Sequence, residues 1–167
     1  MAMRFKIVAG GQTGADRAAL DWAIARSIPH GGWCPKGRKA EDGVIEAKYE
    51  LTETPSADYV QRTEWNVRDS DGTVVFSVAP RLTGGSRKTV ELARKHEKQV
   101  LHICRADGIA AASVALQRFV DENSIRTLNV AGPRASKEPE IAQFVTDVLA
   151  KAWPDPTESK IEAGILR

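Results

Sequence analysis

Short, almost wholly apolar runs alternate along the chain with longer stretches in which apolar residues recur every three or four positions. The short runs are rich in β-branched residues, as expected for strands covered on both faces, and lie at residues 5–9, 73–78, 99–104 and 127–131. The longer stretches have helical periodicity and lie at residues 15–27, 86–96, 108–122 and 138–152. This alternation predicts an α/β fold, a three-layer α/β/α sandwich with a mostly parallel sheet.

The predicted helix at residues 108–122 shows the periodicity most clearly. Its apolar residues are expected to share one buried face, and they are Ile109, Ala112, Leu116, Phe119 and Val120. A shorter helix is expected from Tyr59 to Asp69, because a typical helix start precedes it and a turn rich in aspartate and glycine follows it.

Residues 29–55 interrupt this alternation. They are rich in glycine, proline and charge, and their only apolar pair, Val44-Ile45, is too short to predict an element. A loop of this length inside a compact domain is either functional or disordered. Trp33, Tyr49 and Leu51 are apolar anchors that a disordered linker would lack, so the sequence favours a functional loop.

Length and charge indicate how many domains the chain forms and which partners it binds. The chain has 167 residues, and its 24 Lys plus Arg and 22 Asp plus Glu give a formal charge of +2. This length predicts one domain, residues 1–153, followed by a tail at 154–167 that is loose or lies on a partner subunit. The near-neutral charge argues against nucleic acid or a membrane surface as the main partner.

The cysteines and the first residues indicate the compartment. Cys34 and Cys104 form no Cys-x-x-Cys motif, so both are expected to be reduced thiols. No signal-peptide pattern precedes the first strand, and no apolar run reaches the roughly 20 residues that a membrane-spanning helix needs. We therefore expect a cytoplasmic protein.

Three predicted strands lead into loops that combine glycine with hydroxyl and basic side chains. These loops cover residues 10–17, 80–89 and 132–136. The carboxyl ends of parallel strands meet at one edge of a sheet, so the three loops are expected to converge. Glycine lets the backbone approach a ligand closely, and the start of a helix favours an anion. The convergence predicts a bound phosphate or another oxyanion.

The standard nucleotide motifs are absent from these loops. A phosphate loop of nucleoside triphosphatases needs Gly-Lys-Ser/Thr, but Ala15 and Asp16 follow Gly14 in the first loop. In the second loop Arg87 stands directly before the Lys-Thr pair, where the motif needs glycine, and the glycines of the first loop lack the spacing of the dinucleotide-binding fingerprint. The sequence therefore argues against triphosphate hydrolysis and NAD-dependent chemistry.

Charged residues near the glycine loops leave alternatives open. Asp16 either starts its helix and pairs with Arg17, or recognises an amine or hydroxyl group of a ligand. Lys36 and Arg38 lie in the irregular segment, which is either a solvated loop or a lid that carries cations to a phosphate.

The predicted helix that starts at Tyr59 has a polar face. Arg62, Asn66 and Asp69 recur on it at helical spacing. This face either points at the binding site or is exposed to solvent.

Patterns for catalysis and for metal binding are sparse. No histidine lies beside a plausible nucleophile, and no His-Glu-x-x-His, paired-cysteine or histidine-rich motif occurs. Cys34, which is close to Lys36, is either an ordinary thiol or a thiol of lowered pKa that ligates a soft metal. The sequence predicts no set of metal ligands and favours binding over catalysis.

Five segments together form a recognisable pattern. They are GGQTGADRAALD at 10–21, GWCPKGR at 32–38, EDG at 41–43, RTxxNVxD at 62–69 and TGGSxxT at 83–89. The joint pattern resembles the molybdenum carrier family, a Rossmann-like group related to the Lonely Guy phosphoribohydrolases. The resemblance covers residues 5–150.

The resemblance implies a Rossmann-like fold, a homo-oligomer (dimer or tetramer) and binding of the molybdenum cofactor, a pterin that carries a phosphate and a dithiolene-held molybdenum. The residues implied to hold the anionic part are Gly11, Gln12, Thr13, Gly14, Gly84, Gly85, Ser86 and Thr89. Candidates for the pterin amines are Asp16, Asp42 and Asp69. The predicted binding residues also include Arg17, Lys36, Arg38 and Asn66.

The Lonely Guy enzymes carry a Pro-Gly-Gly-x-Gly-Thr-x-x-Glu loop with a catalytic acid. Here the glycine-threonine step is shifted, and Glu91 follows Thr89 by two residues instead of three. This departure argues against the hydrolase activity.

Three functions therefore remain as hypotheses. The first is a non-catalytic carrier of a small phosphorylated ligand, with the molybdenum cofactor as the named case and a phosphate-bearing, nucleotide-like molecule otherwise. The second is an enzyme that cleaves the N-glycosidic bond of a nucleotide, with Glu91 or Asp16 as the acid-base residue. The third is a domain that senses a nucleotide and signals to a partner.

Overall fold

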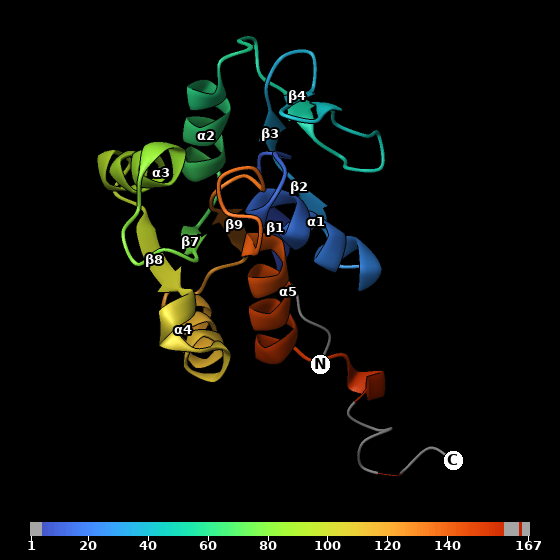
Figure 1. Cartoon of the computed structure of the whole chain (residues 1–167), viewed down its shortest axis with the longest axis vertical. Helices are drawn as coiled ribbons and strands as arrows, with labels where there is room; N and C mark the ends of the chain where they lie inside the picture. The colour runs from blue at the N-terminus through green and yellow to red at the C-terminus, as the bar shows by residue number, and fades with distance from the viewer. Residues whose placement is uncertain (1–4, 159–163, 165–167) are drawn as a thin grey trace.

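A five-stranded parallel sheet forms the centre of the protein, as a computed structural model of residues 5–158 and residue 164 describes it (Figure 1). Across the sheet the strands are β2 (His30–Gly31), β1 (Lys6–Val8), β9 (Thr127–Ala131), β7 (Gly72–Ser77) and β8 (Gln99–Cys104). All four neighbouring pairs are parallel. The predicted α/β class is confirmed.

The apolar runs are strands because both faces of the sheet are covered. Every residue of β7 is buried, and in the register Val74 lies beside Val130 of β9 and Phe76 beside Ile103 of β8. These four side chains are at most 1% exposed. A strand covered on both faces has no side exposed to solvent, so its sequence is a continuous apolar run and does not alternate between apolar and polar residues.

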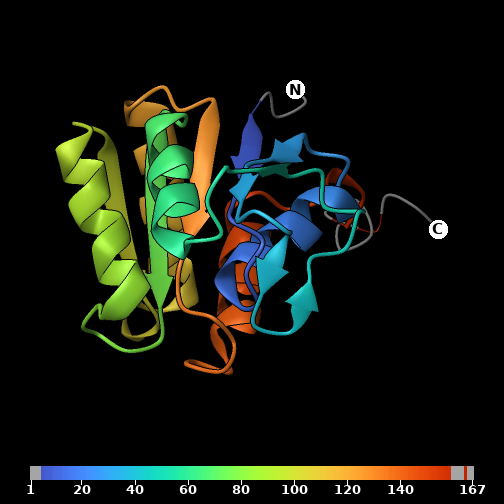
Figure 2. The same ribbon diagram turned by 90° about the horizontal axis from the view of Figure 1, so that it is seen from above.

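Helices form the two outer layers. On one face lie α1 (Ala15–Ala25), α4 (Ile109–Glu122) and α5 (Ile141–Ala152), whose apolar residues join the sheet in the main core. On the other face α2 (Tyr59–Arg68) and α3 (Gly84–Lys95) pack side by side over a smaller cluster of Val67, Leu92 and Ala93 (Figure 2). No helix among the described residues is long and apolar enough to span a membrane.

The predicted buried face of α4 needs one correction. Ala112, Leu116, Phe119 and Val120 are buried, but Ile109 is 40% exposed. Ile109 is the first residue of the helix and follows the short helical turn Arg105–Asp107, so it lies beyond the part of α4 that reaches the core.

Residues 29–55 contain structure that the sequence did not predict. His30–Gly31 is an edge strand of the central sheet, β3 (Trp33–Cys34) pairs with β6 (Thr52–Glu53), and β4 (Lys39–Ala40) forms a hairpin with β5 (Gly43–Val44). Each of these strands has two residues, which is too short for an alternating pattern. Tyr49 and Ile45 are buried in a cluster with residues of α1 and β3, so this segment is anchored to the domain.

The order of the strands reverses in the middle of the sheet, which favours a crevice at the carboxyl ends of the strands. From β1 the chain passes through α1 to β2 on one side, and from β7 it passes through α3 to β8 on the other. Right-handed crossovers in opposite directions put α1 and α3 on opposite faces. In open parallel sheets, ligands bind where the strand order reverses in this way.

The tail expected at residues 154–167 lies partly outside the described residues. The structure describes 154–158 and 164, and residues 159–163 and 165–167 are not covered. The division into a domain and a tail stays a prediction.

Candidate functional site

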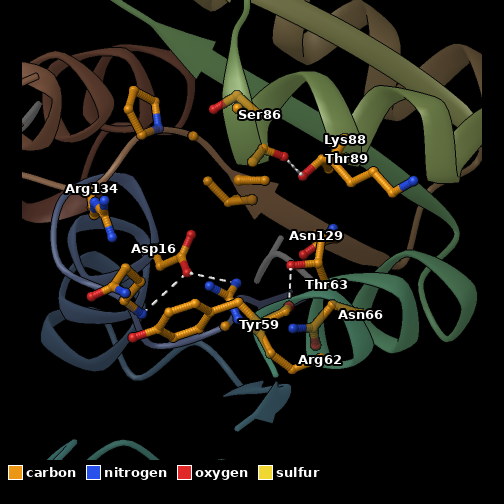
Figure 3. A pocket seen from close by; sticks show the side chains of 18 of the residues that line it. Asp16, Tyr59, Arg62, Thr63, Asn66, Ser86, Lys88, Thr89, Asn129 and Arg134 are labelled. Carbon is orange, nitrogen blue, oxygen red and sulfur yellow. Dashed lines mark hydrogen bonds and ion pairs between the residues drawn. The ribbon is translucent and has the colours of Figure 1, made fainter. Parts of the chain in front are cut away.

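A cavity of about 430 Å³ opens at the carboxyl edge of the sheet (Figure 3). The loop after β1, the start of α3, the loop after β9 and one face of α2 form its walls. The residues that line it are Gly10, Gln12, Asp16, Tyr59, Val60, Arg62, Thr63, Asn66, Gly84, Gly85, Ser86, Lys88, Thr89, Asn129, Val130, Ala131, Gly132, Pro133, Arg134 and Lys137. The three glycine-containing loops therefore meet at one cavity.

Two glycines in the walls are needed for close packing. A Cβ atom at Gly10 would lie 2.2 Å from Nη1 of Arg62, so glycine lets the guanidinium group lie against the first loop. A Cβ atom at Gly132 would lie 2.7 Å from the Cβ of Ala15 and 2.8 Å from the carbonyl oxygen of Phe76. These contacts bring α2 and the loop after β9 close to the first loop.

A buried carboxylate lies at one side of the cavity. Asp16, in the first turn of α1, is 4% exposed, and its Oδ2 accepts a hydrogen bond of 3.2 Å from the Gln12 N–H. Arg62 Nη1 lies 3.4 Å from the same oxygen. Burial raises the pKa of Asp16, and the positive charge of Arg62 partly offsets this effect.

The opposite wall is the N-terminus of α3. No side chain caps this helix, so the N–H groups of its first turn, Gly84, Gly85 and Ser86, have no cap to satisfy them. The partial positive charge of the helix start adds to the charge of Lys137, which also lines the cavity. Lys88 and Arg134 line it too, and their cationic groups lie 3.7 Å from Glu91 and 3.5 Å from Glu41. This wall has the chemistry of an anion site.

Seven of the predicted binding residues line the cavity. They are Gln12, Asp16, Asn66, Gly84, Gly85, Ser86 and Thr89. Some of them already have partners within the protein: Asn66 accepts from the N–H of Trp33 and donates to its carbonyl oxygen, and the Thr89 hydroxyl donates to the carbonyl oxygen of Gly85. Whether these residues contact a ligand stays a prediction.

The other eight lie outside the cavity lining, and they are Gly11, Thr13, Gly14, Arg17, Lys36, Arg38, Asp42 and Asp69. Arg17 forms an ion pair with Asp42, with 2.8 Å between Nη2 and Oδ1. The Thr13 hydroxyl accepts from the N–H of Ala135 and donates to Glu41. These contacts join the first loop to its neighbours, and a direct role in binding stays a prediction.

Arg38 organises the irregular segment. Its guanidinium group donates to the carbonyl oxygens of Ile45 (2.9 Å), Glu46 (2.8 Å), Tyr49 (2.8 Å) and Leu51 (3.2 Å). A guanidinium has five N–H donors in a fixed plane, which suits one residue to hold several carbonyls of an irregular loop. In this structure the cation of Arg38 faces its own loop.

Glu41, in the β4–β5 hairpin, connects three segments. Its carboxylate accepts from the hydroxyl of Thr13 and from the N–H and hydroxyl of Ser136, and Arg134 Nε lies 3.5 Å away. The hydrogen bonds from Ser136 and Thr13 lower the pKa of Glu41. The hairpin is therefore attached to two of the loops that form the cavity.

We expect Glu41→Gln to lower the melting temperature near neutral pH and to have less effect in acid. The lowered pKa means that the ionised Glu41 stabilises the fold above its ordinary pKa of 4.5, and that this contribution is lost as the pH falls through the folded-state value. Circular dichroism melts between pH 7 and pH 3 measure the difference, with Glu46→Gln as the surface control. A difference that stays constant across this range would contradict the role of the carboxylate charge.

The two alternatives that involve Glu91 and Cys34 find little support in the geometry. Glu91 is exposed on α3, where Arg87 and Lys88 lie 3.3 and 3.7 Å from its carboxylate, and it does not line the cavity. The hypothesis of a lowered thiol pKa at Cys34 is wrong, because Cys34 is buried and burial raises its pKa. Across residues 5–158 and residue 164, no three His, Cys, Asp or Glu side chains form a group that could hold a metal ion.

Sequence reasoning left several cavity residues out of the predicted set. The main ones are Gly10, Tyr59, Arg62, Thr63, Lys88, Asn129, Arg134 and Lys137. Tyr59, Arg62, Thr63 and Asn66 follow the spacing i, i+3, i+4, i+7 and therefore lie on one face of α2. That spacing was the available signal, and the face it defines points into the cavity.

Comparisons with known proteins show the family to which the chain belongs. The family model described as the circularly permutated YpsA SLOG family matches residues 7–153. A crystal structure at 1.45 Å resolution of a protein from Syntrophus aciditrophicus SB, named "Putative molybdenum carrier protein", has a TM-score of 0.88 and 47% sequence identity. The similarity covers 90% of this chain and 96% of that one. No curated protein matches the chain. The resemblance inferred from the motifs is thereby confirmed, and the chain belongs to the circularly permutated YpsA SLOG family.

Proposed function

We propose that this protein is a non-catalytic carrier that binds one phosphorylated, ring-bearing small molecule in the cavity, and that its cargo is the molybdenum cofactor. The observation that carries the proposal is the pairing of an uncapped helix N-terminus with a buried carboxylate in one cavity. The name of the similar protein from Syntrophus aciditrophicus supports the choice of cargo.

The phosphate group of the cargo fits the α3 side of the cavity. The backbone N–H groups of Gly85 and Ser86 supply donors, and Lys137 supplies a positive charge: its Nζ lies 2.8 Å from the point where a Cβ of Gly84 would be. A phosphate at a helix N-terminus with a lysine beside it is a common arrangement in proteins.

The ring of the cargo fits the other side. The Asp16 carboxylate can accept hydrogen bonds from ring amines, which a bare phosphate site would not need. The volume of about 430 Å³ lies in the range of roughly 300 to 1,000 Å³ that small-molecule sites occupy. Neither cysteine lines the cavity, so the proposed recognition involves the organic part of the cofactor, whose own dithiolene sulfurs hold the molybdenum.

We expect a cofactor-bearing extract or a phosphorylated pterin to raise the melting temperature of the purified chain, and Lys137→Gln to weaken this effect. Loss of one charge-assisted contact to phosphate costs about 1.5 to 3 kcal/mol, or roughly 10- to 100-fold in Kd. Thermal shift and isothermal titration calorimetry measure the two effects. Lys151→Gln, an equal charge change at an exposed position of α5, is the control.

Mass spectrometry of small molecules released from the gently purified chain tests the cargo directly. A pterin phosphate supports the proposal, and a nucleotide points to the broader ligand class. If no phosphorylated pterin or nucleotide is released and none raises the melting temperature, the carrier function is wrong. The homo-oligomer and the cytoplasmic location stay predictions, and light scattering measures the former.

A second candidate function is cleavage of an N-glycosidic bond. Asp16 favours it, because the residue lines the cavity and burial raises its pKa, which is the direction that a general acid needs. Release of free base from nucleoside monophosphates by the purified chain, abolished in Asp16→Asn, would establish this activity in place of simple carriage.

A further inference from the structure

Asp16 and Arg62 present an ordered set of acceptors and donors to the cavity. The hydrogen bonds that the Asp16 carboxylate accepts from the Gln12 N–H and from Arg62 both end on Oδ2, and the backbone at Gly10 also lowers the pKa of Asp16 through a hydrogen bond. Figure 3 shows the other carboxylate oxygen turned into the cavity. Arg62 is also incompletely used, because its buried Nε has no hydrogen-bond partner and its one contact with Asp16 is long, at 3.4 Å. Side by side, the pair offers the open Oδ1, an Oδ2 that is released if Arg62 leaves its long contact, and the cationic donors of Arg62.

This order is complementary to one particular edge of a heterocycle. A 2-amino-4-oxopyrimidine ring presents an amine, a ring N–H and a carbonyl oxygen in sequence, which is two donors followed by an acceptor. Guanine and pterins share this edge. Adenine presents an amine next to an unprotonated ring nitrogen, so an acceptor would face the carboxylate, and hydrogen bonds would be replaced by repulsion between lone pairs.

We propose that Asp16 and Arg62 together select ligands that carry the 2-amino-4-oxopyrimidine edge and reject adenine. Of the ring amine and the ring N–H, one donates to the open Oδ1. Arg62 leaves its long contact with Oδ2 and donates to the neighbouring carbonyl oxygen, so the other ring group can donate to Oδ2. The proposal rests on the proposed function, because it assumes that a phosphorylated, ring-bearing molecule occupies the cavity. It adds the class of ring and names the two residues that determine it.

The burial of Asp16 is what makes such discrimination effective. A carboxylate that is 4% exposed has little water to replace a missing partner, so a ring that offers it no donor leaves it unsatisfied. Sites built around a buried polar group reject analogues that lack the matching group much more strongly than apolar sites reject small changes of shape.

The first experiment measures the wild-type, full-length chain by isothermal titration calorimetry at fixed salt and neutral pH with GMP, IMP and AMP. All three carry the same phosphate and ribose, so only the ring edge differs. We expect GMP to bind about 10- to 100-fold more tightly than AMP, the range that a bidentate contact to a base edge provides. IMP, which lacks the 2-amino group, is expected to lie between them.

The second experiment reverses the preference. In Asp16→Asn the side chain offers one acceptor and one donor, which matches xanthine, whose ring N–H adjoins a carbonyl oxygen in place of the amine. We expect this variant to lose affinity for GMP and to gain affinity for XMP. The matched control is Asp21→Asn, the same change on the same helix, where the side chain accepts from the Tyr49 hydroxyl outside the cavity lining.

The outcomes separate this inference from the carrier function. If none of these nucleotides and no neopterin monophosphate binds, the proposed function fails and the selectivity fails with it. If GMP and AMP bind equally, or if Asp16→Asn weakens GMP without improving XMP, the selectivity is wrong although a phosphorylated ligand binds. Circular dichroism shows whether the variant folds, and if it does not, the wild-type series with GMP, IMP and AMP still decides the question.

Discussion

Replacing Gly14 with alanine is expected to lower the free energy of unfolding by about 3 kcal/mol, because a non-glycine residue in such a backbone conformation costs roughly 1 to 3 kcal/mol and a clash adds to it. Gly14 precedes α1 with φ 82° and ψ −125°, a region that essentially only glycine adopts. Its Cβ atom would lie 2.4 Å from the carbonyl oxygen of Pro133 and 2.8 Å from the amide nitrogen of Ala135. The loops after β1 and β9 would have to move apart.

Urea or thermal unfolding measures this loss, which corresponds to a fall in Tm of about 10 °C for a chain of this size. Gly37→Ala separates the two causes, since Gly37 also has a positive φ, of 80°, but no neighbouring heavy atom within 4 Å of a Cβ atom. For Gly37→Ala we expect a loss of about 1 kcal/mol from backbone strain alone. Equal losses at both positions would show that the contact with the loop after β9 does not matter.

Replacing Arg62 with methionine is expected to destabilise the protein by about 3 kcal/mol near neutral pH, because removing one partner leaves the other charge buried without compensation. The side chains of Arg62 and Asp16 are 14% and 5% exposed, so solvent cannot replace the lost guanidinium. Methionine keeps an apolar stem of similar length, which limits the effect to the charge.

The pH dependence of this variant identifies the cause. Burial already raises the pKa of Asp16, and loss of Arg62 raises it further. An acid whose folded-state pKa is raised destabilises the fold where it is ionised, and this penalty disappears as the pH falls through the folded-state pKa toward the ordinary value of 3.8. The stability of Arg62→Met should therefore approach that of the wild type in acid. The double variant Asp16→Asn with Arg62→Met should recover stability at neutral pH, and a gap that persists in both tests would mean that Arg62 acts through packing.

The parts of the fold that could be predicted are those in which one residue pattern is long enough to repeat. The strands at 99–104 and 127–131 have the predicted bounds, since each is apolar along most of its length and ends at a clear change of composition. The edge strand His30–Gly31 could not be found in this way, because two residues form no pattern and the strand exists only by pairing with β1. Its position depends on the rest of the fold.

The site shows the same limit at the level of single side chains. The convergence of three glycine loops follows from strand order, which the sequence could indicate. The sequence does not show which groups in those loops are free to bind a ligand. The Gln12 side chain lines the cavity, yet its oxygen accepts hydrogen bonds from the N–H groups of Thr13 and Glu41. Glu41 lies in a hairpin whose position no local pattern determines. Arg62 was recognised on a polar face of a helix, but only packing against Gly10 directs it inward.

The place of β9 in the middle of the sheet has a consequence for synthesis of the protein on the ribosome. Residues 127–131 lie between β1 and β7, so the amino-terminal strands cannot be joined into one sheet until most of the chain has been made. Until then β1 and β7 each have an unpaired edge, and such edges invite association with other nascent chains. A chain that ends before residue 127 lacks the strand that joins its two halves, so ribosomal pausing before this strand is made would leave both edges open to such association.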